Sequence, residues 1–142
     1  MSNNFGFYLK IFIINILFLV LNSNSFANDL SISNISLEER NSSNNTVIIK
    51  FDVSWKNSWR TKINHDAIWL TVRLYNPSGS PLDKKLCQIS STGLNPSGTS
   101  MGSNTNLEIE VPSDKYGAFM RPSSYGVNAT VSSTDVQLTI DY

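Results

Sequence analysis

The sequence of 142 residues is poor in the side chains that build covalent or metal-based sites, because it contains one Cys and one His. A single Cys excludes an internal disulfide and any Cys-based zinc cluster. Charge is scarce and balanced, with 11 Lys+Arg, 11 Asp+Glu and a charged fraction of 15%. A protein that neutralises many phosphates needs a basic surplus, so we expect no nucleic-acid partner. At 40% hydrophobic residues the chain should fold, and its length predicts one domain.

An apolar run near the N-terminus predicts export. Ile11–Leu21 is almost wholly apolar, Lys10 is the only charged residue before it, and Ser25 and Ala27 hold the small-residue positions of a cleavage site. The alternative is an uncleaved anchor, but eleven residues rise only about 16 Å as a helix, well short of a hydrocarbon core of about 30 Å. We therefore expect a cleaved signal peptide at residues 1–27. The domain at residues 28–142 would be secreted or periplasmic, with no membrane span.

The lone Cys87 would then lie in an oxidising compartment. Two interpretations stay open, a buried thiol and an intermolecular disulfide. The apolar residues around it in Leu82–Ile89 predict a strand, which favours the buried thiol.

Hydrophobic residues of the exported part recur with a period of two, which is typical of half-buried strands. Thr46–Trp55 shows this best, since its odd-numbered residues are all apolar. Turn-forming residues at 41–45, 76–79 and 95–98 separate such runs. Seven or eight short strands predict an all-β fold, an antiparallel β-sandwich, with a partly open barrel as the second choice. The predicted strands are Leu30–Leu37, Thr46–Trp55, Ala67–Tyr75, Leu82–Ile89, Leu107–Val111, Gly117–Arg121, Asn128–Val131 and Val136–Tyr142.

Two segments have an unusual composition, Val53–Arg60 (VSWKNSWR) and Asn64–Arg73 (NHDAIWLTVR). They resemble a pattern of secreted bacterial proteins, SW-x-NSWR followed by DA-x-W-x-x-V-[KR], in a module that often precedes a domain similar to formylglycine-generating enzymes. Asp114–Arg121 and Val136–Tyr142 resemble later parts of that module, although Arg121 stands where the family has an aromatic residue. The resemblance implies a β-sandwich accessory module. It implies no activity of the second domain, because the sequence ends at Tyr142.

One short segment combines a base, a carboxylate and an amide, Asn64-His65-Asp66. An enzyme would use His65 as a general base oriented by Asp66, with Arg60 stabilising the developing charge. Side chains of adjacent residues diverge, however, and no Ser or Cys stands in a nucleophile motif. We therefore favour a loop in which Arg60 pairs with Asp66, and we expect no catalytic residue, no metal and no cofactor.

Three tryptophans form the second group of candidates. Trp55 shares the apolar face of its strand and is predicted to lie in the core. Trp59 would follow the end of that strand in a loop, where it could stack on Arg60. A ligand platform built from Trp59, Trp69 and Tyr75 is the alternative to core or loop-anchoring roles. Glu108 and Glu110 are predicted to lie on a solvated strand face.

These observations predict a secreted, non-catalytic module that binds a protein or a surface glycan in the bacterial envelope. The binding candidates are Trp59, Arg60, His65, Asp66, Trp69 and Tyr75. One alternative is a small secreted enzyme centred on His65 and Asp66. Another is a structural subunit of a pilus or adhesin that polymerises by strand exchange.

Overall fold

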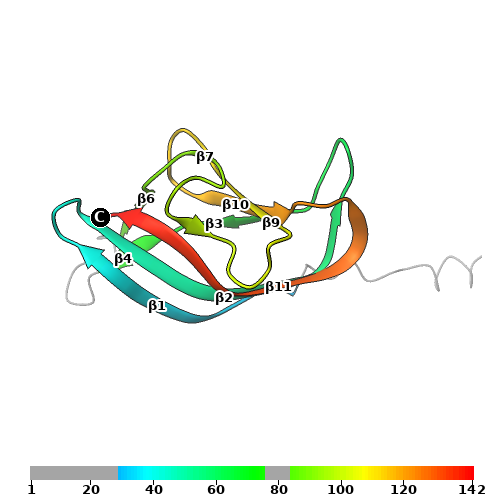
Figure 1. Cartoon of the computed structure of the whole chain (residues 1–142), viewed down its shortest axis with the longest axis horizontal. Coiled ribbons are helices and arrows are strands. Elements are labelled where there is room, and N and C mark those ends of the chain that lie inside the picture. The colour runs from blue at the N-terminus through cyan, green and yellow to red at the C-terminus, as the bar shows by residue number, and fades with distance from the viewer. Residues whose placement is uncertain (1–28, 76–83) are drawn as a thin grey trace, which may run out of the picture.

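The computed structural model describes residues 29–75 and 84–142, and every regular element in these ranges is a β-strand (Figure 1). All strand pairs are antiparallel. The predicted all-β, antiparallel architecture is therefore confirmed. The strands are β1 (Ser31–Asn41), β2 (Thr46–Arg60), β3 (Ile68–Leu70), β4 (Arg73–Tyr75), β5 (Lys84–Leu86), β6 (Gln88–Ile89), β7 (Gly93–Leu94), β8 (Thr99–Ser100), β9 (Leu107–Val111), β10 (Ala118–Pro122) and β11 (Gly126–Asp141).

Two sheets pack face to face. The first has the order β1-β2-β11-β6, and β8 also pairs with β11. The second has the order β3-β10-β9-β7, and β4 and β5 form a separate two-stranded ribbon. In Figure 1 the long strands β1, β2 and β11 form the lower layer, and β3, β9 and β10 lie above them.

The core fills the space between these layers, and its residues follow the predicted alternation. In β2, Phe51, Val53 and Trp55 are buried, as are alternate residues of β9 beginning with Leu107. The predicted inward face of Thr46–Trp55 and the core position of Trp55 are thus correct. Cys87 is also buried and free, so the buried-thiol interpretation holds in this structure.

Strand β2 continues beyond Trp55 to Arg60, so the predicted loop position of Trp59 is wrong. The reason is a β-bulge. Trp55 pairs with Val131 and Ser58 with Ala129, which leaves one extra residue in β2, and Asn57 has a φ of 60°. A second bulge explains why the predicted strands Asn128–Val131 and Val136–Tyr142 are one: β11 continues to Asp141 without a turn, because Asp135 (φ 59°) is accommodated in the ladder.

The predicted strand Ala67–Tyr75 is instead divided between two structures. β3 pairs with β10, whereas β4 pairs with β5, and the chain leaves the ladder at Thr71 and Val72. Val72 accepts a hydrogen bond from the backbone N–H of Cys87, which joins the ribbon to the sandwich. Among the described strands, β3 pairs only with β10, so its other edge has no partner there.

Some predictions fall outside the described residues, namely the signal peptide at 1–27 and the turn at 76–79, and these stay predictions. The turn at 41–45 is present: Asn41 Oδ1 accepts hydrogen bonds from the backbone N–H groups of Ser43 and Asn44. Within the described ranges, no helix is long and apolar enough to cross a membrane.

Candidate functional site

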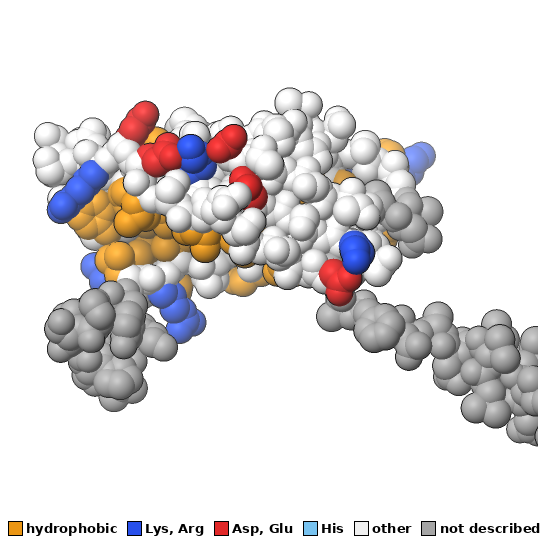
Figure 2. Space-filling model, turned by 90° about the horizontal axis from the view of Figure 1, so that it is seen from below, with side chains coloured by type: hydrophobic (Ala, Val, Ile, Leu, Met, Phe, Trp, Pro, Cys, Tyr) orange, Lys and Arg blue, Asp and Glu red, His pale blue; other side chains and the backbone are white. Residues whose placement is uncertain are grey.

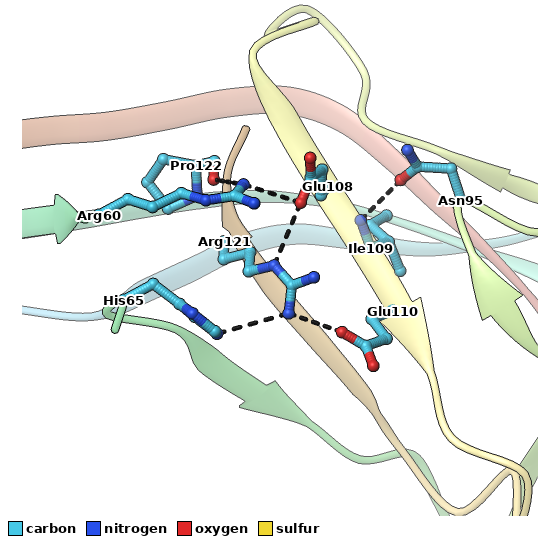
Figure 3. Close-up of polar contacts among 8 residues, drawn as sticks. All are labelled: Arg60, His65, Asn95, Glu108, Ile109, Glu110, Arg121 and Pro122. Atoms are coloured by element: carbon cyan, nitrogen blue, oxygen red, sulfur yellow. Dashed lines mark hydrogen bonds and ion pairs between the residues drawn. The ribbon is translucent and has the colours of Figure 1, made fainter. Parts of the chain in front are cut away.

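An ion-pair network lies where the end of β2 meets the outer face of the second sheet (Figure 3). Alternation along β9 buries Leu107, Ile109 and Val111, so Glu108 and Glu110 must point outward. The β9–β10 register then places Arg121 directly opposite Glu108. We call Arg60, Glu108, Glu110 and Arg121 the Glu108 network.

Glu108 is the centre of this network. Its Oε2 accepts hydrogen bonds from Arg60 Nη1 at 2.8 Å and from Arg121 Nε at 3.1 Å. Arg121 Nη1 also donates to Glu110 Oε2 at 2.6 Å, and Arg60 donates to the carbonyl of Pro122. The Arg60, Glu108 and Arg121 side chains are only 15–19% exposed. Glu108 is therefore a half-buried structural anion, and its assignment to a solvated face is wrong.

The two arginines determine the protonation of Glu108. Partial burial by itself raises the pKa of this carboxyl group, but the hydrogen bonds and positive charges of Arg60 and Arg121 outweigh burial and hold the pKa below its ordinary value. Burial likewise lowers the pKa of Arg121, and its bonds to Glu108 and Glu110 raise it overall. Both groups therefore stay charged at neutral pH, and neither is set up to exchange a proton.

His65 and Asp66 face different neighbours. His65 is exposed, with Nε2 at 3.4 Å from Arg121 Nη1, whereas Asp66 Oδ2 accepts a hydrogen bond from the buried Trp55 Nε1 at 3.1 Å. The backbone N–H of Asp66 donates to the carbonyl of Trp59 at 2.8 Å, which holds the loop against the strand. The ion pair expected between Arg60 and Asp66 is replaced by the pair of Arg60 with Glu108.

The predicted aromatic platform is distributed over two sheets. Trp59 belongs to β2, whereas Trp69 belongs to β3, where its ring lies 4.4 Å from that of Phe119 and packs over Gly117. The Tyr75 side chain lies outside the described part of the chain. Stacking of Arg60 on Trp59 is also not found; its guanidinium lies over the Tyr125 ring, 5.9 Å from the centroid.

Beside the network, a pocket of about 290 Å³ is lined by Trp59, Tyr125, Asn106 and the side of Arg60. We call it the Trp59 pocket. Its lining mixes aromatic and polar groups, and the Asn106 side chain makes no hydrogen bond to any described residue. Ser58, also in the wall, has a buried Oγ without a hydrogen-bond partner in the described structure. The pocket wall thus combines one buried hydroxyl without a partner, an exposed amide and two residues that carry aromatic rings.

Of the six predicted binding residues, Trp59 and Arg60 line this pocket, and His65 reaches the Glu108 network through Arg121. Sequence reasoning missed Tyr125 and Asn106, which lie in loops, and Glu108. The signal for Glu108 was available, because acidic residues alternating on one strand beside an arginine in the next strand can pair across the ladder.

Neither a metal-binding cluster nor a similarity to known proteins assigns a role to this site. In residues 29–75 and 84–142, no group of three or more His, Cys, Asp or Glu side chains converges to hold a metal ion. No family model matches the chain, and no curated protein and no solved structure matches it either. The chemistry of the site must therefore be read from its own residues.

Proposed function

We propose that the protein is a non-catalytic binding module that holds a neutral sugar ring of a surface glycan in the Trp59 pocket. The observation that carries this proposal is the combination of Trp59 and Tyr125 with the exposed amide of Asn106 in the lining of one pocket. Large aromatic faces bury area at low entropic cost, and an amide supplies both a donor and an acceptor for hydroxyl groups. At about 290 Å³ the pocket is at the small end of ligand sites, which supports a single ring.

Charge supports a neutral ligand. Arg60 is the cation in the pocket wall, and its guanidinium is already paired with Glu108 at 2.8 Å and stacked on Tyr125. A paired cation in a half-buried position attracts an anionic group weakly, because the new anion would have to compete with Glu108. A phosphate or a uronate is therefore a poorer candidate than a neutral hexose.

The arrangement of His65 and Asp66 supports a non-catalytic role. A working base and its orienting carboxylate share a hydrogen bond. Here the His65 ring nitrogen faces the cation of Arg121, and Asp66 Oδ2 accepts the indole N–H of Trp55. An accessory role also agrees with the β-sandwich module that the sequence resembles.

We extend the proposal to export: the mature protein would begin at Asn28, which N-terminal sequencing of secreted or periplasmic material tests.

The binding test is a panel of neutral and acidic glycans, followed by tryptophan fluorescence or calorimetry. We expect a neutral sugar to bind, with affinity reduced about tenfold or more by Trp59→Ala or Asn106→Ala. Trp69→Ala is the matched control, because Trp69 is similarly exposed (44% against 37% for Trp59) but lies in the other sheet. Urea unfolding of each variant checks the fold.

Three results contradict the proposal. The first is the absence of binding across the panel, and the second is an equal loss of binding in Trp69→Ala. The third is turnover of a glycan that His65→Ala abolishes while the variant stays folded, since this outcome would favour the enzyme.

A further inference from the structure

The sandwich is open on one side, where an apolar groove runs along β1. Two hollows of about 210 and 300 Å³ share Ile49 and Val72 in their linings, so they adjoin and are described together as one depression. Figure 2 shows hydrophobic side chains of this face in orange, with Lys and Arg side chains in blue and Asp and Glu side chains in red around them. We call this depression the β1 groove. Its apolar lining comprises Ile32, Ile35, Leu37, Val47, Ile49, Phe51, Leu70, Val72, Leu74, Leu138 and Ile140.

The apolar residues of β1 face inward but are not covered. Ile32 pairs with Val53 and Leu37 with Ile49, and directly opposed residues of an antiparallel pair point to the same face. Val53 is 2% exposed, whereas Ile32, Ile35 and Leu37 are 42%, 67% and 69% exposed. Three neighbouring aliphatic side chains on one strand thus lie on the core side of the sheet, and no described strand covers them. An exposed apolar patch of this kind marks an interaction site.

Two strand edges border the groove. β1 is the last strand of the first sheet and β3 is the last strand of the second, and among the described residues neither has a partner on its outer side. The groove wall includes Ile32 and Ile35 from one edge and Leu70 and Thr71 from the other. An extended segment that enters there can place alternate side chains in the groove.

The charges at the groove favour an acidic occupant. Arg73 and Arg40 belong to its lining, which contains no Asp or Glu, and neither arginine has an ion pair within the described residues. Arg40 instead donates to Tyr142 Oη at 2.6 Å and lies over its ring. If a second copy of the chain docked through the same face, arginine side chains of the two copies would face each other, which is unfavourable. A segment with flanking carboxylates would pair with both.

We propose that the β1 groove binds an extended segment of another protein, with alternating aliphatic residues flanked by Asp or Glu. The stretch from Ile32 to Leu37 has six residues, so the occupant would contact it over about 20 Å. The aliphatic side chains cover Ile35 and Leu37, and the carboxylates reach Arg40 and Arg73. This surface is separate from the Trp59 pocket, which shares no lining residue with it.

The test uses two fluorescent peptides with the same alternating Val-Thr-Val-Thr-Val centre, one flanked by Asp and one flanked by Lys. Fluorescence anisotropy should show at least tenfold tighter binding of the Asp-flanked peptide. The double change Ile35→Ser and Leu37→Ser should weaken its binding at least tenfold. Ile63→Ser is the matched control, because Ile63 is 89% exposed and lies outside the groove.

Charge reversal distinguishes specific docking from nonspecific hydrophobic binding. Arg73→Glu should invert the preference between the two peptides, while Lys62→Glu, in the exposed loop, should leave it unchanged. Trp59→Ala should bind the Asp-flanked peptide as the wild type does, so failure of the glycan proposal leaves this one standing. The proposal is overturned by equal binding of both peptides, or by an affinity weaker than about 1 mM. It is also overturned by a dimer in sedimentation that the Ile35/Leu37 double variant dissociates, since a second copy would then be the occupant.

Discussion

Glu108 and Glu110 offer a matched pair of substitutions, because they lie two residues apart on the same face of β9. Glu108→Gln keeps the shape of the side chain and removes its charge, which leaves Arg60 without an anionic partner and Arg121 with Glu110 alone. Glu110→Gln removes one contact of Arg121 and leaves Glu108 in place. The two substitutions therefore compare a central and a peripheral carboxylate of one network.

The expected losses in the free energy of unfolding follow from the exposure of each carboxylate and from the number of its arginine partners. Exposed ion pairs contribute about 0–1 kcal/mol, and breaking a fully buried pair costs about 3–5 kcal/mol. Glu108 is 17% exposed and has two arginine partners, so Glu108→Gln should lower the free energy of unfolding by about 2 kcal/mol. Glu110 is 44% exposed with one partner, so solvent screening keeps the cost of Glu110→Gln below about 1 kcal/mol.

Urea unfolding monitored by tryptophan fluorescence measures both values at pH 7. For a domain of this size, about 2 kcal/mol corresponds to a decrease in Tm of about 8 °C. The m-value should stay constant, since neither substitution changes the surface exposed on unfolding. The reasoning is refuted if Glu108→Gln and Glu110→Gln agree within about 0.5 kcal/mol, because the central position of Glu108 would then contribute nothing.

Three further predictions use the same unfolding assay or a thiol assay. Because Arg60 and Arg121 outweigh burial, the folded-state pKa of Glu108 lies below 4.5. The stability difference between the wild type and Glu108→Gln should therefore be full above about pH 5 and should shrink as the pH falls through the folded-state pKa. A constant difference down to about pH 3 contradicts this prediction. Gly117→Ala should cost about 1–3 kcal/mol, because its Cβ would overlap the Trp69 ring, while Gly126→Ala, with no atom near its Cβ, should change stability much less. Cys87 should react with Ellman's reagent only after unfolding, and rapid labelling of the native protein would refute its burial.

The sequence predicted the elements whose pattern is local. Alternation of period two is visible in Thr46–Trp55 and Leu107–Val111, and both are strands with the predicted faces inward. The boundaries failed where a bulge interrupts the alternation, at Asn57 and at Asp135, since a residue with positive φ inside a ladder looks like a turn in sequence. Local propensity alone does not distinguish the two.

The candidate site was predicted only in part, for a different reason. Arg60 lies in the candidate site, but its anionic partner is 48 residues away on β9, and which strands meet is determined by topology rather than by spacing. Asp66 is nearer in sequence, so local spacing predicts it as the partner. Tyr125 and Asn106 carry no pattern of their own, and the fold alone brings them beside Trp59.

The bulge in β2 connects the fold to the candidate site. Odd-numbered residues of β2 point into the core up to Trp55, so an uninterrupted strand would bury Trp59 and turn Ser58 outward. The extra residue at Asn57 reverses this order: Ser58 is fully buried and Trp59 is exposed at the pocket. It also directs Arg60 toward Glu108 of the second sheet. Bulges are enriched beside functional sites because they re-aim side chains. Here one extra residue buries Ser58 in the pocket wall, turns Trp59 to the exposed side of the strand and brings Arg60 to Glu108.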